Sequence, residues 1–271
     1  MRLIDLSVVT APGQASDPPH QAPVFEYLSH KDNRERVAGM FGTTVDQLPG
    51  GLGWATEKIT LTTHTGCHMD APWHYHPTMD RGAPSATIDQ VPLEWCFSDG
   101  VKLDFSRWDP TVTVTARDIQ AELDRIGYRL KPRDIVLLQS GAAPYFGTAE
   151  YMSHGAGFGE EATLCLLDQG VRVVGTDAHT WDKPFPAMAE EFRRTGDRAA
   201  IWPGHLAGRF QEYYQMEKLT NLDLLPPFGF KVICFPVKLQ ACGAGWTRAV
   251  AWLPDPCPGC HPPTDERKET P

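Results

Sequence analysis

The stretch of sequence that decides the fold is His64-Thr65-Gly66-Cys67-His68-Met69-Asp70-Ala71-Pro72-Trp73-His74. Four of the ten histidines of the chain lie between residues 64 and 76. A helix would place His64 and His68 on one face, but Gly66 between them and Pro72 after them both disfavour a helix. In an extended chain, alternate side chains share a face, so His64, His68 and Asp70 would converge. Pro72 would then end the strand and turn His74 back toward them.

Imidazole nitrogens and a carboxylate are ligands that Zn²⁺ and Mn²⁺ accept in proteins. A lone histidine is more often a hydrogen-bonded or solvated side chain, and a loop of such histidines is the alternative interpretation. Because three or four metal-competent groups share one face here, the pattern predicts a divalent metal site. Cys67 has odd parity and is expected to point away from the metal as a small packing group, although a sulfur ligand is the other interpretation.

Composition sets limits on the partners and the location of the chain. The 271 residues carry a formal charge of −9, which argues against a nucleic-acid partner because phosphate binding needs clustered lysine and arginine. No run of eighteen apolar residues occurs, so we expect no membrane span. Asp5 interrupts the apolar N-terminus, so no signal peptide is expected and a cytoplasmic location follows by default. The seven scattered cysteines are expected to be reduced thiols.

The pattern along the chain predicts one large α/β or α+β domain built on a sheet or barrel. Residues 1–253 form this domain, and residues 254–271 are a proline-rich tail in which Cys257 and Cys260 have no expected role. Residues 11–52 are too irregular for regular structure and are typical of a lid or binding loop. Strands are predicted at residues 1–10, 57–63, 100–105, 134–139, 171–175, 230–237 and 247–253. Helices are predicted after the N-cap Thr115, at 160–169 and at 211–218.

The histidine-rich stretch resembles the signature of the cyclase-like metal-dependent hydrolases, a family that includes bacterial kynurenine formamidase and isatin hydrolase. That signature is His-x-Gly-Thr-His-x-Asp-x-Pro-x-His, and this chain departs from it only in having Cys67 in place of threonine. A later family landmark, a histidine followed twelve residues on by a glutamate, looks like His205 and Glu217. Further similar landmarks are Ile4-Asp-Leu-Ser7, Gly175-Thr-Asp177 and Asn221-Leu-Asp-Leu-Leu-Pro226.

The resemblance implies a three-layer swivelling β/β/α domain with a barrel-like mixed sheet, assembled as a homodimer or homotetramer. It implies that a first metal ion is held by His64, His68 and Asp70. Asp70 would bridge to a second ion held by His205 and Glu217, so one or two Zn²⁺ or Mn²⁺ ions are expected. His74 is implied as the catalytic acid/base, a role that suits an imidazole because it titrates near neutral pH.

The expected function is metal-dependent hydrolysis of a C–N amide or lactone bond in a small cyclic or aryl substrate. Two alternatives stay open: a cyclising or lactone-forming enzyme, and a non-catalytic metal-binding pseudoenzyme. Formamidases carry an early tryptophan against their aromatic substrate, whereas no tryptophan precedes Trp54 here, which leaves the substrate unspecified. Trp54 and Trp73 flank the motif, and His76 and His179 are weaker candidates for the pocket.

Overall fold

The structure is a computed structural model that describes residues 1–254. Nine strands form the main sheet: β1 (Arg2–Asp5), β4 (His68–Asp70), β7 (Phe97–Asp104), β9 (Ile135–Gln139), β11 (Val173–Thr176), β12 (Tyr214–Glu217), β13 (Phe228–Ile233), β14 (Ala244–Trp246) and β15 (Val250–Leu253). The α-helices are α1 (Arg34–Met40), α2 (Pro72–Tyr75), α3 (Ala116–Ile126), α4 (Glu160–Asp168), α5 (Phe185–Thr195) and α6 (Pro203–Leu206). Three small ribbons pair β2 (Val24–Leu28) with β3 (Thr56–Thr60), β5 (Thr78–Met79) with β6 (Ala83–Pro84), and β8 (Thr113–Val114) with β10 (Gly157–Phe158).

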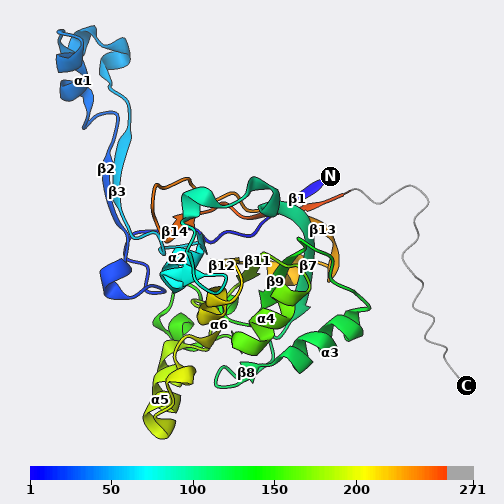
Figure 1. Cartoon of the computed structure of the whole chain (residues 1–271). Helices are drawn as coiled ribbons and strands as arrows, with labels where there is room; N and C mark the ends of the chain where they lie inside the picture. The colour runs from blue at the N-terminus through cyan, green and yellow to red at the C-terminus, as the bar shows by residue number, and fades with distance from the viewer. Residues whose placement is uncertain (255–271) are drawn as a thin grey trace, which may run out of the picture.

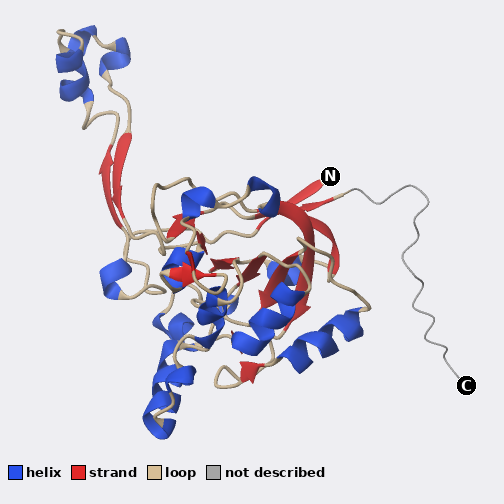
Figure 2. Ribbon diagram, viewed as in Figure 1, coloured by secondary structure: helices blue, strands red, loops and turns tan. Residues whose placement is uncertain are grey.

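The main sheet is mixed, with strand order β1-β15-β13-β7-β9-β11-β12-β4-β14. The four central strands β7, β9, β11 and β12 are parallel, and antiparallel strands extend the sheet on both sides. The sheet curls strongly in Figure 2. This architecture confirms the expected α/β class with a barrel-like mixed sheet.

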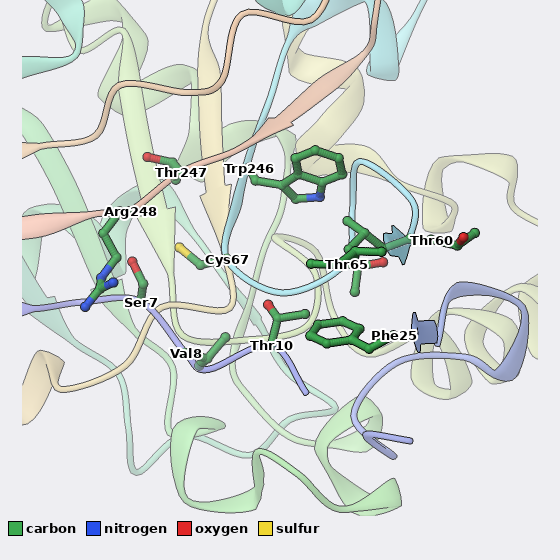
Figure 3. A pocket seen from close by; sticks show the side chains of 12 residues that line it. Ser7, Val8, Thr10, Phe25, Thr60, Thr65, Cys67, Trp246, Thr247 and Arg248 are labelled. Atoms are coloured by element: carbon green, nitrogen blue, oxygen red, sulfur yellow. The ribbon is translucent and has the colours of Figure 1, made fainter. Parts of the chain in front are cut away.

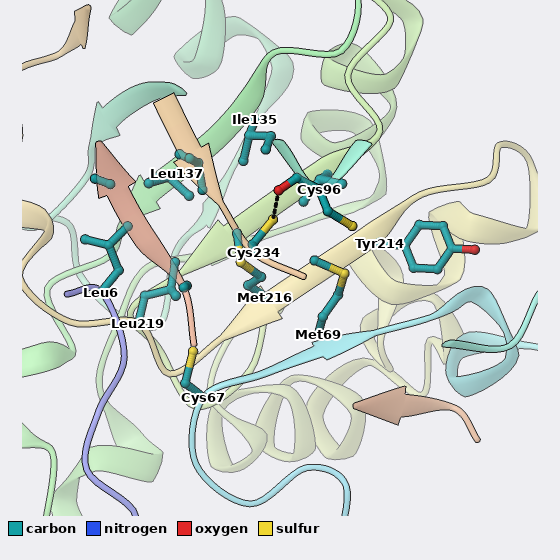
Figure 4. Close-up of a cluster of buried hydrophobic side chains, with 14 of the residues drawn as sticks. Leu6, Cys67, Met69, Cys96, Ile135, Leu137, Tyr214, Met216, Leu219 and Cys234 are labelled. Atoms are coloured by element: carbon teal, nitrogen blue, oxygen red, sulfur yellow. Dashed lines mark hydrogen bonds between the residues drawn. The ribbon is translucent and has the colours of Figure 1, made fainter. Parts of the chain in front are cut away.

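Both faces of the central strands are buried, as parallel strands require. In β9, Ile135 and Leu137 belong to one hydrophobic cluster, whereas Val136 and Leu138 belong to the other. The first cluster also takes side chains from β1 and β4, which lie near opposite ends of the sheet, so the sheet curls around this core (Figure 4). Helices α3 and α4 supply the second cluster and cover the other face (Figure 1).

Capping and charge signals in the sequence account for helices α3 and α4, which the sequence predicted. Helix α3 begins after Thr115, whose side chain and that of Asp118 form a reciprocal capping box, and it ends at Gly127 in the left-handed conformation. Helix α4 has Glu160 and Glu161 in its first turn, where carboxylates favour the positive end of the helix dipole.

The helix predicted for residues 211–218 is wrong, because this segment forms strand β12. Tyr214 and Met216 pack in the core inside the curl, and Gln215 and Glu217 are also buried on the opposite side of the strand. Tyr214-Gln215-Met216-Glu217 alternates apolar and polar residues, but four residues are too few for periodicity to separate a strand from a helix. Helix α5 was also not expected from the sequence.

Residues 11–52 contain more regular structure than expected, since β2 and α1 lie within them. The predicted strand at 57–63 exists as β3, but it pairs with β2 and turns before the histidine motif. Figure 1 shows β2 and β3 as a long arm that projects from the body and carries α1 at its tip. The arm exposes large apolar side chains, with Val24 57%, Tyr27 61% and Phe41 69% exposed.

All five cysteines among the described residues are free thiols, as expected. Cys234 donates a weak hydrogen bond from its Sγ to the carbonyl oxygen of Cys96 at 3.4 Å (Figure 4). Cys257 and Cys260 lie outside the described residues, as does the tail after Pro254. Within residues 1–254, no helix combines the length and apolar character needed to cross a bilayer.

Candidate metal centre

The histidine motif is a tight turn, a three-residue strand and a short helix. Gly66 adopts a left-handed backbone with φ of 67°, and a Cβ at this position would lie 2.3 Å from Thr10 Oγ1, so only glycine fits. The turn at Gly66 brings His64 beside His68, with ring centroids 5.0 Å apart. Pro72 is the first residue of α2, whose turn returns His74 to within 4.1 Å of the His64 ring centroid.

Strand β12 and helix α6 deliver the remaining predicted residues. In the antiparallel pairing of β12 with β4, Glu217 lies opposite His68 and Gln215 lies opposite Asp70. Paired residues present their side chains on the same face of a sheet, which places the Glu217 carboxylate beside the motif. His205 lies in α6 and is 2% exposed. The structure therefore brings all of the predicted metal ligands and His74 into one cluster, called the candidate centre below.

Asp70 lies at the middle of the candidate centre, and each of its carboxylate oxygens faces two imidazoles. Oδ1 is 3.0 Å from His64 Nδ1 and 3.2 Å from His68 Nε2. Oδ2 is 3.9 Å from His74 Nε2 and 4.0 Å from His205 Nε2. Glu217 adds its own carboxylate, with one oxygen 3.6 Å from His68 Nε2 and the other 3.6 Å from His205 Nε2.

Solvent reaches the candidate centre from one side. The side chains of His64 and His74 are 24% and 23% exposed, whereas those of His68 and Asp70 are fully buried. Burial alone would raise the pKa of Asp70, but the surrounding imidazoles of His74, His68 and His64 hold it well below its usual value. Burial, reinforced by the Asp70 charge, raises the pKa of Glu217.

The hydrogen bonds behind the imidazoles set which ring nitrogen faces the carboxylates. His68 Nδ1 lies 2.9 Å from the Gly66 carbonyl oxygen, which only accepts, so Nδ1 carries the proton. The Nδ1 of His205 donates in the same way to Asp182 Oδ2 at 2.5 Å. In the neutral rings, the His205 Nε2 lone pair accepts from the Gln215 amide nitrogen at 2.8 Å. The His68 Nε2 lone pair instead faces Asp70 Oδ1 at 3.2 Å and Glu217 at 3.6 Å, an arrangement that is repulsive unless a cation lies between these atoms.

The His68 lone pair that faces carboxylate oxygens fits a divalent ion, and so does the environment of Asp70. The Oδ1 atom of Asp70 is buried and accepts no hydrogen bond of regular geometry in the structure, although a buried carboxylate oxygen normally has a donor. The ligand atoms of His68, Asp70 and Glu217 lie within 4.8 Å of one another, and so do those of His64, Asp70 and His74. These residues could hold a metal ion at a place where the carboxylate lacks another partner.

Two supporting residues were missed by the sequence analysis. Asp182 fixes α6 as well as the His205 ring, since it accepts hydrogen bonds from the backbone amides of Gly204 at 2.6 Å and His205 at 3.1 Å. Gln215 donates from Nε2 toward Asp70 Oδ2 at 3.3 Å and Glu217 Oε1 at 3.0 Å. Gln215 lies two residues before Glu217, so in a strand both side chains share a face, and this spacing could have identified it. The helix predicted for this segment hid that relation.

The weaker sequence candidates lie in different places. His179 is buried, 5.7 Å from the Phe185 ring centroid, and burial lowers its pKa to about 3. His76 bonds the carbonyl oxygen of its neighbour Thr78 at 3.0 Å and is not part of the candidate centre. Trp54 packs edge-on against Phe41 near the tip of the arm.

Cys67 points away from the candidate centre, as its parity indicated. It belongs to the core inside the curled sheet and also lines a separate cavity of about 560 Å³, whose lining includes none of the predicted ligands. Figure 3 shows the Cys67 thiol in this cavity with Trp246, Phe25 and Arg248 around it. Burial raises the pKa of Cys67 to about 11, which leaves the thiol protonated near neutral pH.

A buried ion pair holds the loop that carries His64. Lys218, which is 1% exposed, pairs with the buried carboxylate of Asp17. The Lys218 ammonium also donates to the His64 carbonyl oxygen at 2.7 Å. Because Asp17 lies just before the arm and Lys218 follows Glu217, this pair connects the base of the arm to the candidate centre.

Known structures share this fold. Isatin hydrolase A from Labrenzia aggregata, solved with benzyl benzoate, superposes with a TM-score of 0.73 at 23% identity over 93% of both chains. Isatin hydrolase A from Ralstonia solanacearum gives 0.72 at 22% identity over 93% of this chain and 92% of that one. A predicted metal-dependent hydrolase from Bacillus stearothermophilus gives 0.56 at 19% identity over 92% and 97%.

The sequence itself matches the family model described as "Putative cyclase" over residues 4–183. This range is more than half of the chain and includes the whole motif from His64 to His74. It ends before His205 and Glu217, which join the motif only through the three-dimensional structure. The match confirms the resemblance found in the sequence, and the chain belongs to the putative cyclase family.

Proposed function

We propose that the chain is a metal-dependent hydrolase that cleaves a C–N amide or lactone bond in a small cyclic or aryl substrate. The observation that carries the proposal is the arrangement around Asp70, whose two carboxylate oxygens each face two imidazoles and whose buried Oδ1 accepts no hydrogen bond of regular geometry. The isatin hydrolase and metal-dependent hydrolase names of similar structures support the same reaction class. When bound, a divalent ion would polarise a substrate carbonyl and acidify a water molecule.

His74 is the group that we assign to proton transfer. Its imidazole lies at the solvent-open side and its Nε2 faces the same space as Asp70 Oδ2. Burial lowers the pKa of His74 to about 3, with Asp70 opposing the shift and the neighbouring imidazoles adding to it. This value differs from the near-neutral titration that the sequence suggested and that best suits proton transfer, so the assignment rests on the position of the ring, which is neutral near pH 7. A neutral imidazole can accept a proton from an attacking water and return it to the leaving nitrogen or oxygen. Asp182 and Gly66 would keep His205 and His68 in fixed orientations during this step.

We propose that the centre holds one ion rather than two. A second ion would need the space shared by His205 Nε2, Asp70 Oδ2 and Glu217 Oε1. The Gln215 amide nitrogen already occupies that space, at 2.8, 3.3 and 3.0 Å from these atoms. The ion would then be held by His64, His68 and Asp70 on the Oδ1 side. Zn²⁺ and Mn²⁺ both suit this set of nitrogen and oxygen donors.

Metal analysis tests this assignment directly. We expect about one equivalent of metal in the purified protein, loss of activity on chelation, and recovery with Zn²⁺ or Mn²⁺. Replacing Gln215 by alanine would clear the second position, and the stoichiometry is then expected to rise toward two. Protein that is active without metal would contradict the proposed chemistry, whereas two equivalents in the wild type would contradict only the single-ion assignment.

A panel of formanilides, isatins and dienelactones, followed by absorbance, would distinguish the reaction types. We expect hydrolysis of at least one amide or lactone in the panel. If the protein instead forms a ring or lactone from the open acid, the cyclising alternative is correct. If it holds metal but turns over none of the panel, the non-catalytic alternative gains support.

We also propose that the chain assembles as a homodimer or homotetramer through the arm. A two-stranded ribbon is marginally stable in water unless something covers it, and this one exposes Val24, Tyr27 and Ile59 along its length. Light scattering is expected to give a mass of two or four times the 30.1 kDa of one chain. A monomer at micromolar concentration would show that the arm has another role.

A further inference from the structure

Trp202 lies beside the candidate centre. Its indole stacks on the His205 ring with centroids 4.9 Å apart and planes 13° from parallel. It is also 5.5 Å from the His74 ring centroid. Trp202 is half-buried, so part of the indole stays accessible, and His74 marks the solvent-open side of the centre. A molecule that reaches His74 therefore passes next to this indole.

The backbone of Trp202 is strained. Its φ of 55° and ψ of 41° lie in the left-handed helical region, which bulky L residues rarely adopt. The next residue is Pro203, which normally pushes the residue before it into an extended conformation. Such strain persists only when the surrounding structure imposes it, and it clusters at sites that bind or react with ligands. The chain thus holds a large aromatic ring in a place where glycine would be easier to accommodate.

The indole N–H of Trp202 is an unused donor. Its Nε1 is buried and has no hydrogen-bond partner in the structure. By contrast, the indole of Trp181 donates to Thr163 Oγ1 at 2.9 Å, and that of Trp246 donates to the Thr62 carbonyl oxygen at 2.9 Å. A buried indole normally finds an acceptor. The unpaired N–H is a second sign, beside the backbone strain, that the packing around Trp202 is not optimised for stability.

We propose that Trp202 is the substrate-recognition residue of this centre, and that it selects a planar aryl compound bearing a carbonyl or carboxylate oxygen. The aryl ring would stack on the part of the indole that His205 leaves open, and the oxygen would bind at the candidate centre. Phe185, which is 40% exposed and 6.4 Å from the Trp202 centroid, extends the same aromatic wall. The ligand is called a substrate because this inference rests on the proposed hydrolase function. Recognition of the aryl ring, however, can be measured as binding without turnover.

The test compares two carboxylates that differ only in the ring. Benzoate is flat and aromatic, whereas cyclohexanecarboxylate is similar in size, saturated and puckered, and both present the same anion to the metal. Calorimetric titration of the metal-loaded protein is expected to show benzoate binding about three- to tenfold tighter, the range expected for one aromatic stacking contact. Trp202→Leu is expected to abolish this preference, and Trp202→Phe is expected to keep most of it.

Two further variants keep the result interpretable. Trp202→Gly adopts the left-handed backbone without strain and serves if the leucine variant does not fold. Trp252→Phe is the matched control, because the Trp252 Nε1 is also buried without a partner, while its strand β15 lies among β1 and β13. This control is expected to bind both carboxylates as the wild type does.

The outcomes separate the two proposals. If the wild type shows no preference for benzoate, or if Trp202→Leu and Trp202→Gly keep it, recognition by Trp202 is wrong even when the protein hydrolyses amides. If the preference exists and depends on Trp202 in a protein that hydrolyses no amide or lactone, the recognition site stands and the hydrolase proposal fails. The ratio of kcat/KM for formanilide over N-cyclohexylformamide should fall in Trp202→Leu by the same factor as the binding ratio.

Discussion

Replacing Asp70 by asparagine is expected to remove the bound metal and to lower kcat/KM by about 10³-fold or more. The carboxylate is the only group in the candidate centre that faces His64, His68, His74 and His205 together. An asparagine keeps the shape but loses the negative charge. Its amide nitrogen would also point N–H groups toward the imidazole lone pairs that should bind the metal ion. Lewis-acid stabilisation is worth several kcal/mol, which corresponds to about this factor in rate. Metal content by elemental analysis and steady-state kinetics would measure the two effects.

The matched control for this change is Asp99→Asn. Asp99 is partly exposed and pairs with Lys131 at 2.6 Å and Lys231 at 2.7 Å, on β7 and outside the candidate centre. We expect it to retain both metal and activity. An Asp70→Asn protein with a full equivalent of metal and near-normal turnover would show that the centre is built around other residues.

The second large effect is expected for His74→Ala, which should lower kcat by about 10²- to 10⁴-fold while the metal stays bound. This is the range for losing a positioned proton-transfer group. His74 Nε2 is 3.9 Å from Asp70 Oδ2, farther than His64 and His68 are from Oδ1, so a metal held on the Oδ1 side does not need it. Metal analysis of the same preparation used for kinetics is essential to the interpretation.

His76→Ala is the control, since His76 lies two residues on and bonds to Thr78 rather than to the centre. It should leave turnover unchanged. Loss of metal together with activity in His74→Ala would make His74 a ligand with His64 and Asp70, a grouping that their mutual distances also allow. Normal turnover with bound metal would remove His74 from the reaction.

The clustering of the local part of the candidate centre could be predicted from the sequence because that part lies within eleven residues. Parity placed His64, His68 and Asp70 together, and Pro72 marked the turn that returns His74. The actual strand is shorter than imagined, since β4 covers only His68–Asp70 and His64 arrives through the Gly66 turn. The side chains still converge, because the turn at Gly66 places the His64 ring 5.0 Å from that of His68 and its Nδ1 3.0 Å from Asp70 Oδ1.

The rest of the site could not be found from periodicity. Asp182 and Trp202 reach His205 through loops whose course depends on tertiary packing, and neither belongs to a periodic segment. Gln215 was hidden because the sequence predicts a helix at residues 211–218, whereas Tyr214–Glu217 form a strand buried on both faces. In the same way, β2 was missed because its partner β3 lies far along the chain. The nearest paired residues, Leu28 and Thr56, are 28 positions apart, and the two strands stabilise each other only after folding.

The Lys218–Asp17 pair gives the arm a thermodynamic connection to the centre. Displacing Asp17 would leave a buried ammonium without its carboxylate, a state that costs about 3–5 kcal/mol in proteins, and the same ammonium holds the His64 carbonyl. A contact that fixes the base of the arm would therefore favour the geometry in which His64 faces Asp70. Linkage is reciprocal, so a ligand that tightens this geometry would strengthen the subunit contact that we propose for the arm by the same factor. Assembly through the arm and occupancy of the centre would then be two coupled equilibria.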